Sequence, residues 1–223
     1  MWNFLDKFIR RAQYKFGRYA VSNLMAIICA GQLGVYLCEM MFPALNLSYM
    51  LACYRSEIFS GQVWRLFTCF FLPPSAGIIF IAFVLYFYYM VGGALENEWG
   101  SFRFDLFYLT GMIGVWISML ITGYGSSYYL NLSLFLAFAI LYPDYQFLLF
   151  FIIPVKSKWL ALADLVMLVL SFCFTPGWSA KIAIILSLGN IILFFGRSAF
   201  IYIKNEIYFS KTRRNWRQNS RRY

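Results

Sequence analysis

Long apolar stretches alternate with short polar stretches along most of the chain. Six of these apolar stretches predict membrane-spanning helices, at about residues 20–42, 77–95, 102–122, 126–142, 159–174 and 179–203. Turn-forming residues separate them, with tight turns expected at 97–101, 123–125 and 175–177. The pattern therefore predicts an all-α polytopic membrane protein built as a six-helix bundle.

The loop between the first two predicted spans, residues 43–76, has a mixed character. Within it, apolar residues recur at helical spacing, at Val63, Leu66, Phe67 and Phe70. Trp64 favours the water–lipid interface, and Arg65 can place its guanidinium among headgroups or on loop carbonyls. We therefore expect a short amphipathic helix lying in the interface, although a plain juxtamembrane anchor has the same signature.

The segment 145–158 is apolar but too short to span a membrane, and Pro154 interrupts it. We expect it to make an interfacial excursion that ends at Lys156 and Lys158 on the cytoplasmic edge.

The composition supports one membrane domain. The chain has 223 residues, of which 62% are hydrophobic and 13% charged, and its mean hydropathy is +0.66. Soluble domains are less apolar and carry about twice that charged fraction. We divide the chain into a basic amphipathic lead (1–19), a membrane domain (20–203) and a basic tail (204–223).

The net charge of +10 is concentrated in the lead and the tail. Basic flanks stay in the cytoplasm, so both termini are expected there and the number of spans is expected to be even. Anionic lipid headgroups are a sufficient partner for the tail, and nothing in the pattern points to nucleic acid. The lipid-facing basic residues are expected to be Lys211, Arg213, Arg214 and Arg217.

Two residue types limit the chemistry. The five cysteines form no C-x-x-C pair, so we interpret them as apolar packing residues and expect neither a metal site nor a disulfide framework. Histidine is absent from the chain. The commonest general base, and the usual partner of a catalytic Ser or Cys, is therefore missing.

The loop motif V-W-R-L-F-T-x-F-F, the A-L-E sequence at the end of the second span and the W-G that follows resemble the rhomboid-like superfamily. That superfamily contains intramembrane serine proteases, derlins and other inactive members. The resemblance covers about residues 20–200 and implies a six-helix rhomboid-like fold. Its motif residues here are Trp64, Arg65, Thr68, Phe71, Glu96 and Gly100.

Two departures from the protease pattern are informative. A rhomboid protease carries its nucleophile in a G-x-S-G-type motif on the fourth span and its histidine on the sixth. Ser133 is nearest to the nucleophile position, but no Gly precedes it at that spacing, and the matching region of the sixth predicted span, 186–190, has no His. We expect Ser133 to be an inactive packing residue, bonded to a carbonyl one turn back or to Asn131 or Asn190.

Other catalytic arrangements are weaker. An aspartyl protease would need Asp105 and Asp164 together, whereas ion pairing with Arg103, Lys156 and Lys158 at the membrane edge is the better account. A Ser–Lys dyad would need Lys181, which we expect to snorkel to the interface. The remaining charges in apolar runs are Glu39 and Arg197. A small-solute transporter needs polar groups near the middle of the membrane, and this sequence offers few of them.

The resemblance implies a pseudoprotease, derlin-like in character, that binds membrane-protein clients and perturbs the bilayer locally, as in membrane protein quality control. An active intramembrane protease with a non-standard site, or a structural or transport subunit, is the alternative. No cofactor is expected. The location expected is the bacterial cell membrane, or the endoplasmic reticulum membrane if the source is eukaryotic, and the oligomeric state is left open.

Overall fold

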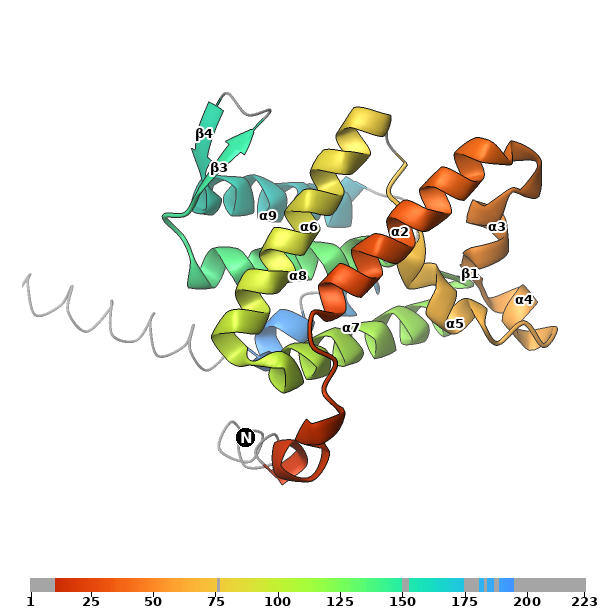
Figure 1. The fold of residues 1–223 in the computed structure, drawn as a ribbon, viewed down its shortest axis with the longest axis horizontal. Helices are drawn as coiled ribbons and strands as arrows, with labels where there is room; N and C mark the ends of the chain where they lie inside the picture. The colour runs from red at the N-terminus through yellow and green to blue at the C-terminus, as the bar shows by residue number, and fades with distance from the viewer. Residues whose placement is uncertain are drawn as a thin grey trace, which may run out of the picture.

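The computed structural model describes residues 11–75, 77–149, 153–174, 181–182, 184–186 and 189–194. Within these residues, four helices are long and apolar enough to cross a membrane (Figure 1). They are α2 (Leu24–Met41), α6 (Ile78–Trp99), α7 (Ser101–Thr122) and α9 (Ser157–Phe174). The helical membrane class is confirmed, and the count of six spans stays a prediction.

Two further predicted spans have shorter counterparts. The fourth is α8 (Tyr128–Leu141), an apolar helix of 14 residues. Residues 184–186 and 189–194 of the sixth are helical. In the lead, residues 11–16 are helical and a 3₁₀ turn, η1 (Gly17–Tyr19), follows. Residues 1–10, the turn at 175–177, Arg197 and the basic tail with its four lipid-facing residues lie outside the described residues.

The predicted turn at 97–101 is wrong in its extent. Helix α6 continues through Trp99, and Gly100 alone separates it from α7. Gly100 has φ +78°, a left-handed conformation that glycine adopts without strain, and its N–H donates to the Glu96 carbonyl at 2.8 Å. A single glycine is therefore a sufficient connection between these two helices.

The first loop contains a series of short elements rather than one helix. These are η2 (Pro43–Leu45), α3 (Leu47–Leu51), β1 (Cys53–Tyr54), α4 (Arg55–Phe59), α5 (Arg65–Thr68) and η3 (Cys69–Phe71). The helix predicted around Trp64 is confirmed as α5 and η3. Its apolar face is divided, because Phe70 is buried whereas Val63 and Phe67 are exposed. Its position in the interface stays a prediction.

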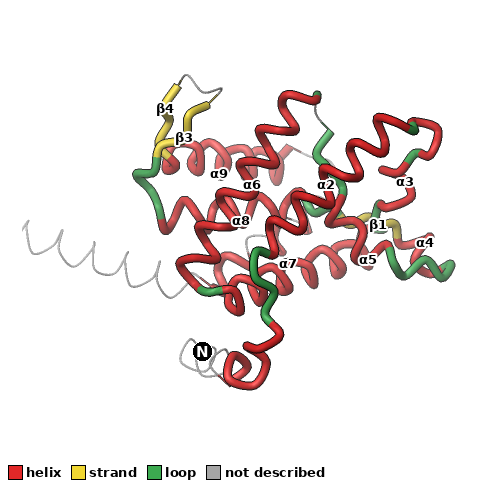
Figure 2. Tube along the Cα trace, viewed as in Figure 1, coloured by secondary structure: helices red, strands yellow, loops and turns green. Residues whose placement is uncertain are grey.

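The segment expected to make an interfacial excursion, 145–158, contains an antiparallel hairpin, and its position at the interface stays a prediction. Strand β3 (Gln146–Leu149) pairs with β4 (Ile153–Lys156), and Gln146 lies opposite Lys156. β-Branched and aromatic residues favour strands, and Pro154 prevents a helix from continuing. The hairpin stands at one edge of a mostly helical molecule (Figure 2).

The contacts between loops define two ends of the bundle, which we name outer and inner after the expected topology. Which end faces the cytoplasm stays a prediction. At the outer end, β1 pairs with β2 (Tyr124–Gly125), which joins the first loop to the turn after α7. At the inner end, the Asn23 N–H donates to Glu96 Oε1 at 2.9 Å, and the Tyr142 hydroxyl donates to Glu98 Oε2 at 3.0 Å. Helices α2, α6, α7 and α8 therefore run alternately between the two ends.

Helix α6 occupies the centre of the bundle and packs against α2, α7 and α8 (Figure 1). Gly92 makes this close contact possible, because a Cβ there would overlap Met25 of α2. The adjacent Gly93 has open space where its Cβ would lie. The other side of α8 packs against α9, so α8 is buried along most of its length.

Candidate functional site

Arg65 is the centre of the first loop. Its side chain is 4% exposed, and its Nη1 donates to the carbonyls of Tyr49 at 2.6 Å and Ala52 at 3.1 Å. Its Nε donates to Gln62 Oε1 at 2.7 Å, and Glu57 lies 3.9 Å from Nη2. The prediction that loop carbonyls bind this guanidinium is confirmed.

Three neighbours of Arg65 extend the same arrangement. The Thr68 hydroxyl donates to the Leu51 carbonyl at 3.3 Å, and Phe71 packs against Gly31 of α2. Trp64 is exposed, as an interfacial anchor would be. The motif residues at 64–71 therefore fix the shape of the loop.

Glu96 and Gly100 lie at the opposite, inner end. Glu96 is buried, and its Oε1 accepts hydrogen bonds from the Asn23 N–H and from the Ser101 hydroxyl at 2.7 Å. It thus connects the start of α2 to the α6–α7 junction. The motif residues predicted from the sequence are therefore two structural clamps at opposite ends of the bundle, not one site.

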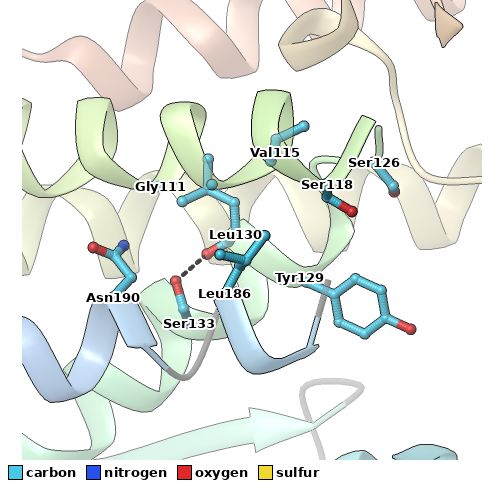
Figure 3. Close-up of a pocket in the computed structure, with 10 residues that line it drawn as sticks. Gly111, Val115, Ser118, Ser126, Tyr129, Leu130, Ser133, Leu186 and Asn190 are labelled. Carbon is cyan, nitrogen blue, oxygen red and sulfur yellow. Dashed lines mark hydrogen bonds between the residues drawn. The ribbon is translucent and has the colours of Figure 1, made fainter. Parts of the chain in front are cut away.

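Ser133 is fully buried on α8, and its hydroxyl donates to the Leu130 carbonyl at 2.7 Å (Figure 3). The expected bond to a carbonyl one turn back is confirmed. Asn190, one of the two asparagines expected as alternative partners of Ser133, binds α7 instead. Its Nδ2 donates to the Phe107 carbonyl at 3.3 Å, and its Oδ1 accepts from the Thr110 hydroxyl at 2.8 Å.

A small cavity of about 20 Å³ lies between these side chains. Gly111 and Ser118 of α7, Ser133 of α8 and Asn190 border it, as Figure 3 shows. This volume accommodates about one water molecule. A peptide bond with its flanking residues does not fit next to the Ser133 hydroxyl.

A much larger cavity, of about 570 Å³, lies at the outer end between the first loop, α6 and α8. The tyrosines that line it are Tyr49, Tyr54, Tyr88, Tyr124 and Tyr128. Asn131 also lines it beside Tyr88, and its buried Oδ1 has no hydrogen-bond partner among the described residues. Sequence reasoning missed this site, although the number of tyrosines near the predicted outer turns was a signal.

A family model, the Rhomboid domain, matches residues 60–199, which is more than half of the chain. The chain belongs to the rhomboid family. The matched region begins just before Trp64 and includes the short helix α8 with Ser133. A comparison with curated proteins finds no match.

Membership of the rhomboid family makes the missing base the central chemical fact of the site. The chain contains no histidine, so the Ser–His pair of rhomboid proteases has no counterpart. A Ser hydroxyl is a weak nucleophile unless an adjacent base activates it. Among the described residues, no cluster of His, Cys, Asp and Glu is suited to hold a metal ion.

The two carboxylates of the aspartyl alternative are in different surroundings in this rhomboid domain. Asp105 Oδ2 accepts the Val21 N–H at 2.7 Å, beside the start of α2. Asp164 lies on α9, and its buried Oδ2 has no hydrogen-bond partner in the described part of the chain. Among the described residues, no hydrogen bond joins the two, so a dyad that shares one proton is not assembled.

The ion pairs expected for Asp105 and Asp164 are also wrong. Lys156 and Lys158 each lie 3.2 Å from Asp144 Oδ1 at the base of the hairpin. These two ammonium groups lower the pKa of Asp144. Lys156 is the last residue of β4 and Lys158 is the second residue of α9, which places both at the base of the hairpin rather than inside the bundle.

Proposed function

We propose that this rhomboid-family protein is a pseudoprotease that binds the transmembrane helices of other membrane proteins without cleaving them. One observation carries this proposal: Ser133 is fully buried, its proton is engaged by the Leu130 carbonyl, and the chain contains no histidine to activate it. The cavity beside it has room for about one water molecule, too little for a substrate.

Unpartnered polar atoms within the bundle support client binding. Within the part of the chain that the structure describes, Asn131 Oδ1 and Asp164 Oδ2 are buried acceptors with no donor. Asp164 is the eighth residue of α9, about 10 Å from the helix start by its rise per residue, and a carboxylate at such a depth is costly unless it is paired. A client helix with a basic or amide side chain supplies the missing donor, so unstable, polar transmembrane helices are the clients that we infer.

The length of α8 supports local perturbation of the bilayer. Its 14 residues span about 21 Å, against a hydrocarbon thickness of about 30 Å. A short helix is accommodated by thinning the bilayer around it, and this mismatch costs less for a client helix that is itself short or polar. The basic tail adds attraction to anionic headgroups.

We further infer that the inner end of the bundle and both termini face the cytoplasm. Lys156, Lys158 and Arg103 belong to the inner end. At the outer end, the Arg65 charge is engaged by Glu57 and by hydrogen bonds, which lowers the cost of carrying an arginine across the membrane. The proposed location is the bacterial cell membrane, or the endoplasmic reticulum membrane if the source is a eukaryote, with the same orientation in either case.

Two measurements test this function. A fluorophosphonate probe should leave the purified protein unlabelled while it labels an active rhomboid protease run in parallel. A photo-crosslinking residue at Tyr128, in the outer cavity, should capture a single-span helix with a central Lys more strongly than its all-Leu counterpart. The same crosslinker at the exposed Ile79 is the control for random contact.

Labelling of Ser133 would show that its hydroxyl is activated and would refute the proposal that the protein is a pseudoprotease. Equal capture of the Lys and Leu helices at Tyr128 would refute recognition of polar helices. Asp164→Asn should reduce the preference for Lys several-fold, whereas Asp144→Asn, at the exposed hairpin, should leave it unchanged.

A further inference from the structure

Two of the five cysteines lie in the first loop, at the outer end of the bundle. Cys53 is on β1 and Cys69 begins η3, and their side chains are 0% and 1% exposed. Both belong to the hydrophobic core, and both are free thiols in the structure.

Two hydrogen bonds bring the segments that carry these cysteines together. Arg65 donates to the Ala52 carbonyl at 3.1 Å, and Thr68 donates to the Leu51 carbonyl at 3.3 Å. Cys53 follows Ala52, and Cys69 follows Thr68. The two thiols are close enough for each to shift the pKa of the other, and the Cys69 S–H donates to the Leu66 carbonyl at 3.5 Å.

The other three cysteines have different surroundings. Cys29 is buried within the helices and donates to the Leu85 carbonyl at 3.5 Å. Cys38 and Cys173 are exposed at separate places, on α2 and α9. Among the described residues, mutual contact therefore singles out Cys53 and Cys69.

We propose that Cys53 and Cys69 form a disulfide when the outer end faces an oxidising compartment. This proposal rests on the orientation inferred above, because disulfides persist on the extracytoplasmic side and are kept reduced in the cytosol. It revises the expectation from the sequence that all five cysteines serve only for packing.

The local environment assigns different roles to the two thiols. The Cys69 S–H and the nearby Arg65 lower the pKa of Cys53, whereas the contact with Cys53 and burial raise the pKa of Cys69. Cys53 is therefore the thiolate that attacks first. Cys69 lines the outer cavity, which gives the pair a route to solvent.

The oxidant is a disulfide of the extracytoplasmic space, carried by a protein or a small thiol compound. The Cys53 thiolate attacks one of its sulfurs, which forms a mixed disulfide and releases the other sulfur as a thiol. Cys69 then loses its proton, attacks the Cys53 sulfur and displaces the second thiol. Two protein thiols are oxidised and one disulfide is reduced.

The bond closes a ring of residues 53–69 that contains Arg65 and both helices α4 and α5. Because Tyr54 and Cys69 line the outer cavity, the ring fixes one wall of that cavity. The disulfide thus holds the proposed client site in one shape under oxidising conditions.

The test uses the full chain, taken in its native membrane and denatured in the presence of excess N-ethylmaleimide, so that buried free thiols are also blocked before digestion. Mass spectrometry should find the Cys53 and Cys69 peptides joined, lighter by two hydrogen atoms and free of maleimide. Reductant should lower the apparent Tm of the parent by several degrees and leave that of the double Cys53→Ser, Cys69→Ser variant unchanged. Cys29→Ser is the matched control and should keep the joined peptides.

Maleimide on both cysteines would overturn the proposal. A second labelling experiment identifies the cause, with Ser60→Cys in a chain whose native cysteines are replaced by Ser. If an impermeant maleimide labels this residue in intact cells, the orientation holds and the disulfide alone is wrong. If it does not, the loop is cytoplasmic and the disulfide is refuted together with the orientation, while client capture is judged separately by the crosslinking at Tyr128.

Discussion

At the scale of single residues, Arg65 shows how one side chain fixes a loop. Its planar guanidinium reaches the carbonyls of Tyr49 and Ala52 and the side chain of Gln62 at the same time. An ammonium group lacks this fork of donors. Lys is therefore a poor replacement at this position, although it carries the same charge.

We expect Arg65→Ala and Arg65→Lys both to lower the Tm of the detergent-purified protein. Each buried acceptor left without a donor costs about 1–3 kcal/mol. Arg55 is the matched control, because it is exposed and makes one hydrogen bond from its side chain, to the Leu120 carbonyl at 3.0 Å. An Arg65→Lys protein as stable as the parent would contradict this account and would favour a simple headgroup contact.

Ser133→Ala should leave the cellular phenotype of the protein unchanged, because no base activates the hydroxyl. The stability cost should be about 1 kcal/mol or less, since the carbonyl of Leu130 belongs to the same helix as its donor. Growth or client levels in cells that carry the variant provide the measurement. Lost function at normal protein abundance would count against the pseudoprotease.

The residues that sequence reasoning placed correctly have partners close by in the chain. Arg65 binds its own loop, and Ser133 binds a carbonyl three residues earlier. Asn190 and the lysines at the hairpin were assigned the wrong partners, because their choice depends on which helices lie side by side. The charge pattern alone carries no such information.

At the scale of elements, the contact between α2 and α6 provides a matched pair of glycines. Gly92→Ala should destabilise the protein, because the new methyl group overlaps Met25. Gly93→Ala should have little effect or be mildly stabilising, because its Cβ lies in open space on the same helix. Thermal melts of both variants in the same detergent give the comparison, and equal Tm values would refute this packing.

The base of the hairpin should respond to pH through Asp144. Lys156 and Lys158 lower the pKa of this carboxyl from its usual value of 3.8. The stabilisation from these two ion pairs is therefore fully present at a pH above the usual carboxyl pKa, and it is lost as the pH falls through the lowered pKa of Asp144. A ¹³C NMR titration should show the depressed pKa.

Replacing both lysines by Gln should return the Asp144 pKa toward its usual value. A carboxyl that titrates identically in the parent and in the double variant would show that the ion pairs do not form in solution. Asp144 is exposed, so the effect on global stability should be small.

The helices could be predicted from the sequence and the hairpin could not. Long apolar runs fix the approximate bounds of α2, α7 and α9. A short apolar run such as 146–153 fits a strand or a helix equally well, so its pairing emerged only in the structure. The turn before α7 was overestimated, because polar residues at 97–98 continue the last turn of α6.

At the scale of the whole molecule, the proposed topology can be tested at the two ends of the bundle, which should face opposite sides of the membrane. A reporter that is active only outside the cytoplasm should give signal when it is fused within the outer loop at Gly61 and none when it is fused after Tyr223. The pairing of β1 with β2 places the first loop and the turn after α7 on the same side, so a fusion at Gly123 should match the one at Gly61. Strong signal at Tyr223 would exclude an even number of spans.

The partners of Arg65 have a consequence for how the protein is made. Tyr49, Ala52, Glu57 and Gln62 all precede Arg65 in the chain, so each has left the ribosome before the arginine itself. The loop can therefore close around its charge during synthesis and be translocated as a locally folded unit. The strand β2 is made only after α6 and α7, so the β1–β2 pairing comes last and secures a loop that is already closed.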